Sequence, residues 1–233
     1  MSIQMFALPY AGGSASIYND WVSKLKPSIN VCPIEYAGHG SRFCEDFYPS
    51  IEDAAEDISE MIKSQQEEDY VIYGHSMGCL VALETAFVLS RKNAVMPKAI
   101  IVAATRPPHL MHKDRPLGNL SKDELMKAIA ALGQFEPEIF EYEELYELIS
   151  DIMYADVQVF TKYKRRYDTE KIDIPLIVLT GDGDDEAPAE DMKEWQYYTS
   201  GSFSFNEFKG NHFFAFNDNE EFLGYIKKLI TTI

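Results

Sequence analysis

Ser76 has the clearest chemical context of any residue in this sequence. It is the central residue of Gly74-His-Ser-Met-Gly78, and this G-x-S-x-G pattern lies between an apolar run, Tyr70–Gly74, and a helical pattern, Met77–Ser90. A sharp turn from a strand into a helix strains the backbone of the central serine, and the two glycines leave room for the helix and a neighbouring strand. The pattern therefore predicts a serine nucleophile at the carboxyl end of a sheet, where ligands bind in α/β folds.

Serine is a weak nucleophile until a base takes its proton, and histidine is the usual base. The chain has five histidines, His39, His75, His109, His112 and His212. His75 adjoins the serine, so its side chain is expected to point away, and His39 precedes the nucleophile in a turn that it is expected to shape. His212 follows the last strand candidate in a glycine-preceded loop. We predict His212 as the base, the alternative being a solvated loop histidine.

A carboxylate beside the base fixes the tautomer of its imidazole and stabilises the imidazolium. The segment Gly181–Glu186 follows a strand candidate and contains three aspartates. Because the glycine makes the turn, the aspartate three residues later is expected to point back toward the histidine, which selects Asp184. Asp182 and Asp185 remain open alternatives. The serine, the aspartate and the histidine occur along the chain in the order of the α/β-hydrolases.

An acyl-transfer site also needs two backbone N–H groups for the oxyanion of the tetrahedral intermediate. The N–H of Met77, directly after the nucleophile, is the first candidate. The second is expected in the glycine-containing loop Leu8–Gly13, which follows the first strand candidate. Its position favours Ala11 as the donor, with Tyr10 as the alternative.

Short apolar runs alternate along the chain with amphipathic segments. The strand candidates are Ile3–Leu8, Val31–Tyr36, Tyr70–Gly74, Ala99–Ala104, Ile174–Thr180 and Ser202–Phe208. The helix candidates are Ile51–Gln66, Met77–Ser90 and a segment from about Asn219 to the C-terminus. The fourth and fifth strand candidates lack polar alternation, as is typical of strands covered on both faces. The pattern predicts an α/β fold, with a mostly parallel central sheet flanked by helices.

Residues 107–166 interrupt this alternation with helical patterns at Ser121–Leu132, Tyr142–Ile149 and Asp151–Tyr163. We predict a single domain, residues 1–233, in which this helical insertion between the fourth and fifth strands forms a lid. A helical decoration without a gating role is the alternative. Apolar lid residues that could line an acyl channel, or simply pack together, are Leu132, Phe135, Ile139, Phe140 and Met153.

Composition excludes several partners. Acidic residues outnumber Lys and Arg by 38 to 21, a formal net charge of −17, which argues against binding to nucleic acid or to an anionic membrane. Three sparse cysteines, no basic stretch at the start and no long apolar run predict a cytoplasmic protein in a reducing compartment. We expect a monomer without cofactor or metal.

Four segments together resemble the type II (editing) thioesterases of nonribosomal peptide and polyketide synthases, which belong to the α/β-hydrolase superfamily. They are Pro9-Tyr-Ala-Gly-Gly-Ser14, Gly74–Gly78, Gly181–Asp184 and Gly210-Asn-His-Phe-Phe214. The resemblance implies hydrolysis of acyl groups from the phosphopantetheine thiol of carrier proteins. Two segments differ from the family: Ala37-Gly-His39 stands where Pro-Gly-Arg is common, and Tyr154-Ala-Asp156 where Arg-Ala-Asp is common.

Other functions remain open at this stage. A medium-chain fatty acid thioesterase and a small-molecule carboxylesterase would use the same three residues, and a non-catalytic binding protein would keep only the fold. Two basic clusters could form a positive rim that orients an acidic carrier protein, although ordinary surface charge explains them equally well. They are Arg106, His109, His112, Lys113 and Arg115, and Lys162, Lys164, Arg165 and Arg166.

Overall fold

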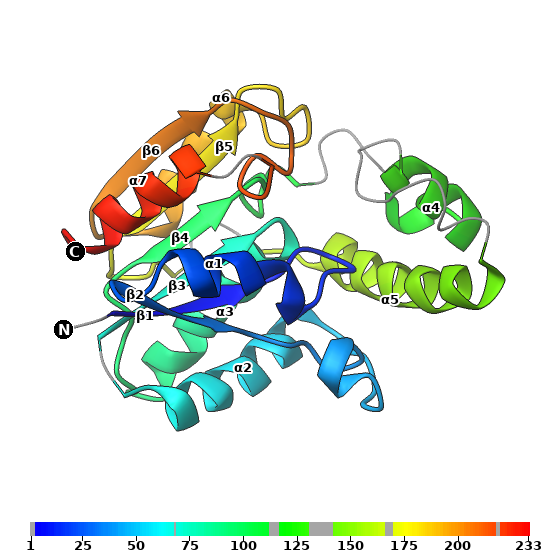
Figure 1. Cartoon of the computed structure of the whole chain (residues 1–233), viewed down its shortest axis with the longest axis horizontal. Coiled ribbons are helices and arrows are strands. Elements are labelled where there is room, and N and C mark those ends of the chain that lie inside the picture. Colours follow the sequence, from blue (N-terminus) through cyan, green and yellow to red (C-terminus); the bar gives the residue numbers. More distant parts are fainter. Residues whose placement is uncertain (1–2, 68, 112–116, 131–141, 166–169, 218–219) are drawn as a thin grey trace.

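Six strands form one parallel sheet in the computed structural model, which describes residues 3–67, 69–111, 117–130, 142–165, 170–217 and 220–233 (Figure 1). Their bounds are β1 Ile3–Leu8, β2 Ile29–Pro33, β3 Tyr70–His75, β4 Ile100–Ala103, β5 Leu176–Gly181 and β6 Phe203–Phe208. The order across the sheet is β2-β1-β3-β4-β5-β6, and each neighbouring pair is parallel. The predicted α/β fold is confirmed, and the carboxyl ends of all these strands lie at one edge.

Helices cover both faces of the sheet (Figure 1). The helices α2 (Ile51–Gln65) and α3 (Met77–Arg91) cover one face, and α1 (Asn19–Lys24) and α7 (Glu220–Ile230) cover the other. Side chains alternate along each strand, so Phe6 and Leu8 join the core beneath α2 and α3, whereas Met5 and Ala7 join the core beneath α1 and α7. The sheet is therefore buried on both sides, as its apolar runs predict.

The helix α2 shows how the sequence sets these elements. Its N-cap residue Ser50 accepts a hydrogen bond from the Asp53 N–H at 3.0 Å. Ile51, Ile58 and Ile62 recur at helical spacing and are buried against the core.

The shorter elements are η1 Ala15–Tyr18, η2 Gly40–Arg42, η3 Leu117–Asn119, α6 Ala189–Met192 and η5 Lys193–Tyr198. Within the described residues, no helix is long and apolar enough to cross a membrane.

Two helices, α4 (Lys122–Ala130) and α5 (Glu143–Lys162), follow β4 and precede β5 in the chain. Figure 1 shows them side by side beyond the carboxyl ends of the strands. Together they bury a small apolar cluster, Leu125, Met126, Ile129, Met153 and Val157. We call this pair of helices the lid; that it gates the site stays a prediction.

The short helices α1 and α6 were not among the helix candidates, and two further elements differ from the sequence-based expectation. The patterns Tyr142–Ile149 and Asp151–Tyr163 form the single helix α5, because the Ser150 hydroxyl bonds back to the Glu147 carbonyl at 2.9 Å instead of capping a new helix. The second strand ends at Pro33 rather than at residue 36, and Tyr36 already belongs to the following turn.

Candidate active site

Ser76 lies at the junction of β3 and α3 with φ 52° and ψ −118°, a conformation that L-residues rarely adopt. The turn is tight on both sides. A Cβ on Gly74 would lie 2.3 Å from the Gly78 carbonyl oxygen, and a Cβ on Gly78 would lie 2.4 Å from the Leu8 carbonyl oxygen. The Ser76 N–H donates to the Ala103 carbonyl at 2.8 Å, which fixes the serine at the carboxyl edge of the sheet.

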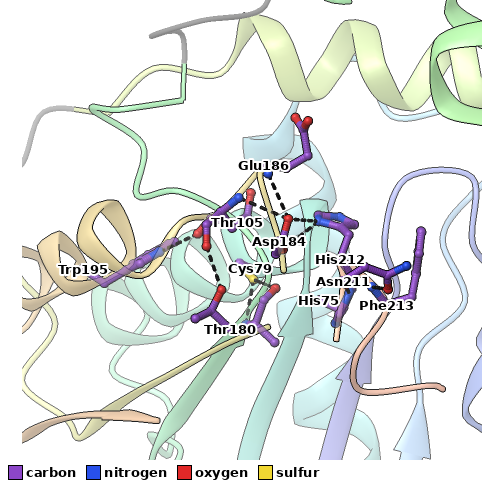
Figure 2. A network of polar contacts seen from close by, with 12 residues as sticks. His75, Cys79, Thr105, Thr180, Asp184, Glu186, Trp195, Asn211, His212 and Phe213 are labelled. Atoms are coloured by element: carbon purple, nitrogen blue, oxygen red, sulfur yellow. Dashed lines mark hydrogen bonds and ion pairs between the residues drawn. The ribbon is translucent and has the colours of Figure 1, made fainter. Parts of the chain in front are cut away.

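His212 and Asp184 lie in direct contact at the same edge. The His212 Nδ1 is 3.0 Å from Asp184 Oδ2 and 3.2 Å from Oδ1 (Figure 2). The Glu186 and Ala187 N–H groups donate to Asp184 Oδ1 at 3.0 and 3.2 Å, so the carboxylate is held on both sides. A carboxylate can only accept, so Nδ1 of His212 carries a proton and donates it in this hydrogen bond. The Nε2 of His212 is then left as the basic nitrogen.

The two alternative aspartates lie elsewhere. Asp182 is exposed, and its Oδ1 accepts the Gly210 N–H at 2.9 Å. Asp185 is also exposed, whereas only 5% of Asp184 is exposed to solvent. The geometry therefore favours Asp184 as the partner of His212, as the turn spacing predicts.

His75 contributes a contact that the sequence argument missed. Its ring is fully buried, and its Nε2 lies 2.9 Å from the backbone carbonyl oxygen of His212, while the Tyr73 hydroxyl lies 3.1 Å from its Nδ1. A carbonyl only accepts, so Nε2 carries the proton and Tyr73 donates to Nδ1. Burial lowers the pKa of His75 well below its usual value, which keeps the ring neutral. The signal in the sequence that could have indicated this contact is a histidine on a strand that is covered on both faces.

Ser76 and His212 line one cavity of about 100 Å³. Tyr10 and Ala11, from the loop after β1, line it as well. Its other side is largely apolar and includes lid residues Ile129, Met153, Val157 and Phe160. Of the proposed acyl-channel residues, Met153 lines the cavity, and Leu132, Phe135, Ile139 and Phe140 lie outside the described residues.

The loop after β1 packs against the serine turn. Gly78 lies against the carbonyl oxygens of Leu8 and Pro9, so this loop and the start of α3 are in contact. The Tyr36 hydroxyl donates to the Pro9 carbonyl at 3.0 Å. Met77, whose N–H is the first oxyanion candidate, is the first residue of α3. These contacts bring both predicted oxyanion segments to the cavity that Ser76 lines.

Neither arginine that the structure describes in the proposed basic rim is available to a carrier. Arg106 pairs with Asp191 at 2.8 Å, and both side chains are about 15% exposed or less. Arg165 pairs with the buried Glu84 at 2.5 Å and stacks over the Phe87 ring. The rim hypothesis is therefore wrong for these two residues. His112, Lys113, Arg115 and Arg166 lie outside the described residues.

Cys79, in the first turn of α3, is buried, and its Sγ lies 3.1 Å from both the Gly74 and the Ala103 carbonyl oxygens, either of which can accept its proton. Burial raises the pKa of its thiol, which suits a packing role. Among the described residues, no group of three His, Cys, Asp or Glu side chains is arranged to hold a metal ion.

Comparison with known proteins gives a consistent result. The family model described as "Thioesterase domain" matches residues 3–230. Thioesterase PikA5 of Streptomyces venezuelae is 30% identical over 214 residues, which cover 91% of this chain and 75% of that protein. The structure of ClbQ from the colibactin NRPS/PKS pathway has a TM-score of 0.91 at 27% identity and covers 100% and 98% of the two chains. The RedJ thioesterase from the prodiginine pathway of Streptomyces coelicolor has a TM-score of 0.87 at 29% identity, covering 97% and 85%.

Proposed function

The chain belongs to the thioesterase domain family, and from this premise we propose that it hydrolyses acyl thioesters on the phosphopantetheine arm of carrier proteins. The pathway setting we propose is editing in nonribosomal peptide or polyketide synthesis, because ClbQ and RedJ come from such pathways. One observation carries the chemistry. Ser76 and His212 line the same cavity, and Asp184 holds the far nitrogen of His212.

Each residue has a defined role in this proposal. The Ser76 Oγ attacks the thioester carbonyl carbon while His212 Nε2 takes its proton, and Asp184 stabilises the resulting imidazolium. The Met77 and Ala11 N–H groups bind the oxyanion. When the tetrahedral intermediate collapses, the C–S bond breaks and the imidazolium protonates the departing thiolate. Water then attacks the acyl-serine ester with His212 again as base, releasing the carboxylic acid and restoring Ser76.

The cavity indicates what kind of acyl group would enter. The lid side is apolar, so hydrocarbon chains would gain from leaving water there. The reacting carbonyl would lie at the polar end, beside Ser76 and His212. This division suits an acyl chain held in the lid with its thioester at the sheet edge.

Mass spectrometry of carrier proteins loaded with different acyl groups tests the proposal. The wild-type protein is expected to return several acyl-carriers to the free thiol form, and Ser76→Ala is expected to return none above the uncatalysed rate. Faster turnover of the matched small oxyester than of the acyl-carrier would instead indicate a carboxylesterase. Absence of labelling of Ser76 by a fluorophosphonate would overturn the enzyme assignment in favour of a binding protein.

A further inference from the structure

Asp156 connects the lid to the loop that carries Ala11. It lies on α5, and its carboxylate is almost fully buried. One oxygen, Oδ2, accepts the Gly12 N–H at 2.7 Å and lies 2.9 Å from the Nε2 of His39. Three segments far apart in the chain therefore meet at one carboxylate oxygen, although neither Asp156 nor His39 lines the cavity beside Ser76.

The surroundings of His39 define its charge. Its Nδ1 lies 3.0 Å from the Ala37 carbonyl oxygen, which can only accept, and its Nε2 faces the carboxylate of Asp156. Both ring nitrogens must then carry protons, so the bound ring is an imidazolium. Because His39 is only 2% exposed, this is a buried ion pair. Removal of either charge would leave the other buried without a partner.

The contact acts next to the oxyanion site. Gly12 follows Ala11, so holding the Gly12 N–H fixes the peptide plane on the carboxyl side of Ala11, which adjoins the plane that carries the Ala11 N–H. Gly12 has φ 76°, a backbone conformation that residues other than glycine rarely adopt. N–H groups that bind an oxyanion are effective because they are already in position before the reaction. A shift of about 1 Å in such a group can lower the rate by ~10²-fold.

We infer that Asp156 is a positioning residue for the oxyanion loop, Leu8–Gly13, and that the His39 imidazolium is its counter-ion, so that the Asp156 contact holds the loop most firmly while His39 is protonated. The inference rests on the proposed role of the Ala11 N–H. Glu35 provides a second connection between the same segments, since its carboxylate accepts the Ala15 N–H at 2.9 Å and the Ser41 N–H at 3.2 Å.

The titratable groups facing His39 are Asp156 from α5, and Glu35 and Tyr36 from the segment after β2. Burial lowers the pKa of His39, but the hydrogen bond and charge of Asp156, with smaller contributions from Ala37 and Glu35, raise it above its usual value. A raised pKa in the folded state means that the stabilisation is complete below about pH 6.5 and is lost as pH rises through the folded value. The loop should loosen on the alkaline side.

The test compares wild type, His39→Arg and Asp156→Asn in acyl-carrier hydrolysis between about pH 6 and pH 9. The remaining site residues are the same in all three proteins, so the informative quantity is the ratio of kcat/KM values. The ratio of His39→Arg to wild type is expected to rise about tenfold across the range, because arginine keeps its charge throughout. For Asp156→Asn, kcat is expected to fall without the wild-type loss at high pH. A ratio that stays constant with pH would overturn the inference.

A second measurement does not depend on turnover or on Asp156→Asn folding well. Hydrogen exchange at the Gly12 amide, expressed as a protection factor, should fall with rising pH in the wild type and stay constant in His39→Arg. Equal protection of this amide in both proteins at all pH values would contradict the inference. Failure of acyl-carrier hydrolysis in every protein, with this exchange difference present, would overturn the proposed function and leave the Asp156 contact standing.

Discussion

The two sides of the candidate active site are held by different forces. Ser76 lies between β3 and α3, and nearly every residue of both elements is buried in the main core. The lid has a far smaller apolar cluster, and exposed side chains such as Leu145 and Leu148 lie along α5. It contacts the oxyanion loop through the Asp156 carboxylate and through Ala11, which packs against the lid cluster. Packing therefore holds Ser76 in place, whereas the opposite wall depends on a smaller apolar cluster and on the Asp156 contact.

The largest effect is expected for Asp184→Asn on the rigid side. Asparagine keeps the shape but favours the wrong tautomer of His212, so kcat should fall by about 10⁴-fold. Assays of acyl-carrier hydrolysis that are quenched at fixed times measure this kcat directly. Asp185→Asn is the matched control, since that residue is exposed, and its kcat should stay within about twofold of wild type. An equal loss in Asp185→Asn would show that the partner of His212 has been misassigned.

Gly78→Ala tests the claim that packing fixes the serine turn. The new Cβ would lie 2.4 Å from a backbone oxygen of Leu8, so the loop or the helix must shift. The free energy of unfolding should fall by roughly 1–3 kcal/mol or more, measured by urea denaturation. Gly224→Ala in α7 is the control, because a Cβ there meets no atom within 4 Å, and it should stabilise by about 0.5–1 kcal/mol. Similar losses in both variants would remove the packing argument.

His75→Phe tests whether the core reaches the catalytic histidine. Phenylalanine fills similar space but cannot donate to the His212 carbonyl, which lies 2.9 Å from the histidine ring. The lost contact, worth about 1–3 kcal/mol, predicts a kcat ~10–100-fold lower with KM little changed. Tyr73→Phe, which removes the hydrogen bond to the other ring nitrogen, should have a smaller effect in the same direction. An unchanged kcat in His75→Phe would mean that His212 is positioned without it.

The smallest effects are expected from removing one methylene group from the main core and one from the lid. Ile72→Val in β3 removes a fully buried methylene from the main core and should lower the free energy of unfolding by about 1 kcal/mol. Ile129→Val in α4 should lower it less, because we expect the smaller lid cluster to open locally without global unfolding. Since Ile129 lines the cavity, its truncation should shift preference toward longer acyl groups by a few-fold in kcat/KM. Equal destabilisation by both would mean that the lid and the main core unfold as one unit.

The sequence predicted the parts of the molecule that depend on local patterns. β1 begins and ends where its apolar run does, and α2 matches its periodicity to within one residue. Glycine spacing around Ser76 predicted a tight turn with a strained serine, because local sterics set it, and Ser76 has φ 52°. The turn after β5 brings Asp184 to His212 for the same reason: its glycine spacing is local.

Contacts between distant segments could not be predicted in this way. His39 and Asp156 lie 117 residues apart, and His75 and His212 lie 137 residues apart. The periodicity of a sequence does not indicate which distant residues pair. The ion pairs of Arg106 and Arg165 could not be predicted for the same reason. The continuous helix α5 was missed because two adjoining helical patterns do not show by themselves whether they form one helix or two. That the protein is a cytoplasmic monomer stays a prediction.

The most direct test of the central claim is the covalent intermediate on Ser76. An acyl-carrier is mixed with the protein, the reaction is stopped within a turnover, and the peptide containing Ser76 is weighed by mass spectrometry. We predict an increase equal to the acyl group on Ser76 in the wild type and no such adduct in Ser76→Ala, which should also fail to release the acid. Hydrolysis at the wild-type rate by Ser76→Ala would contradict the account.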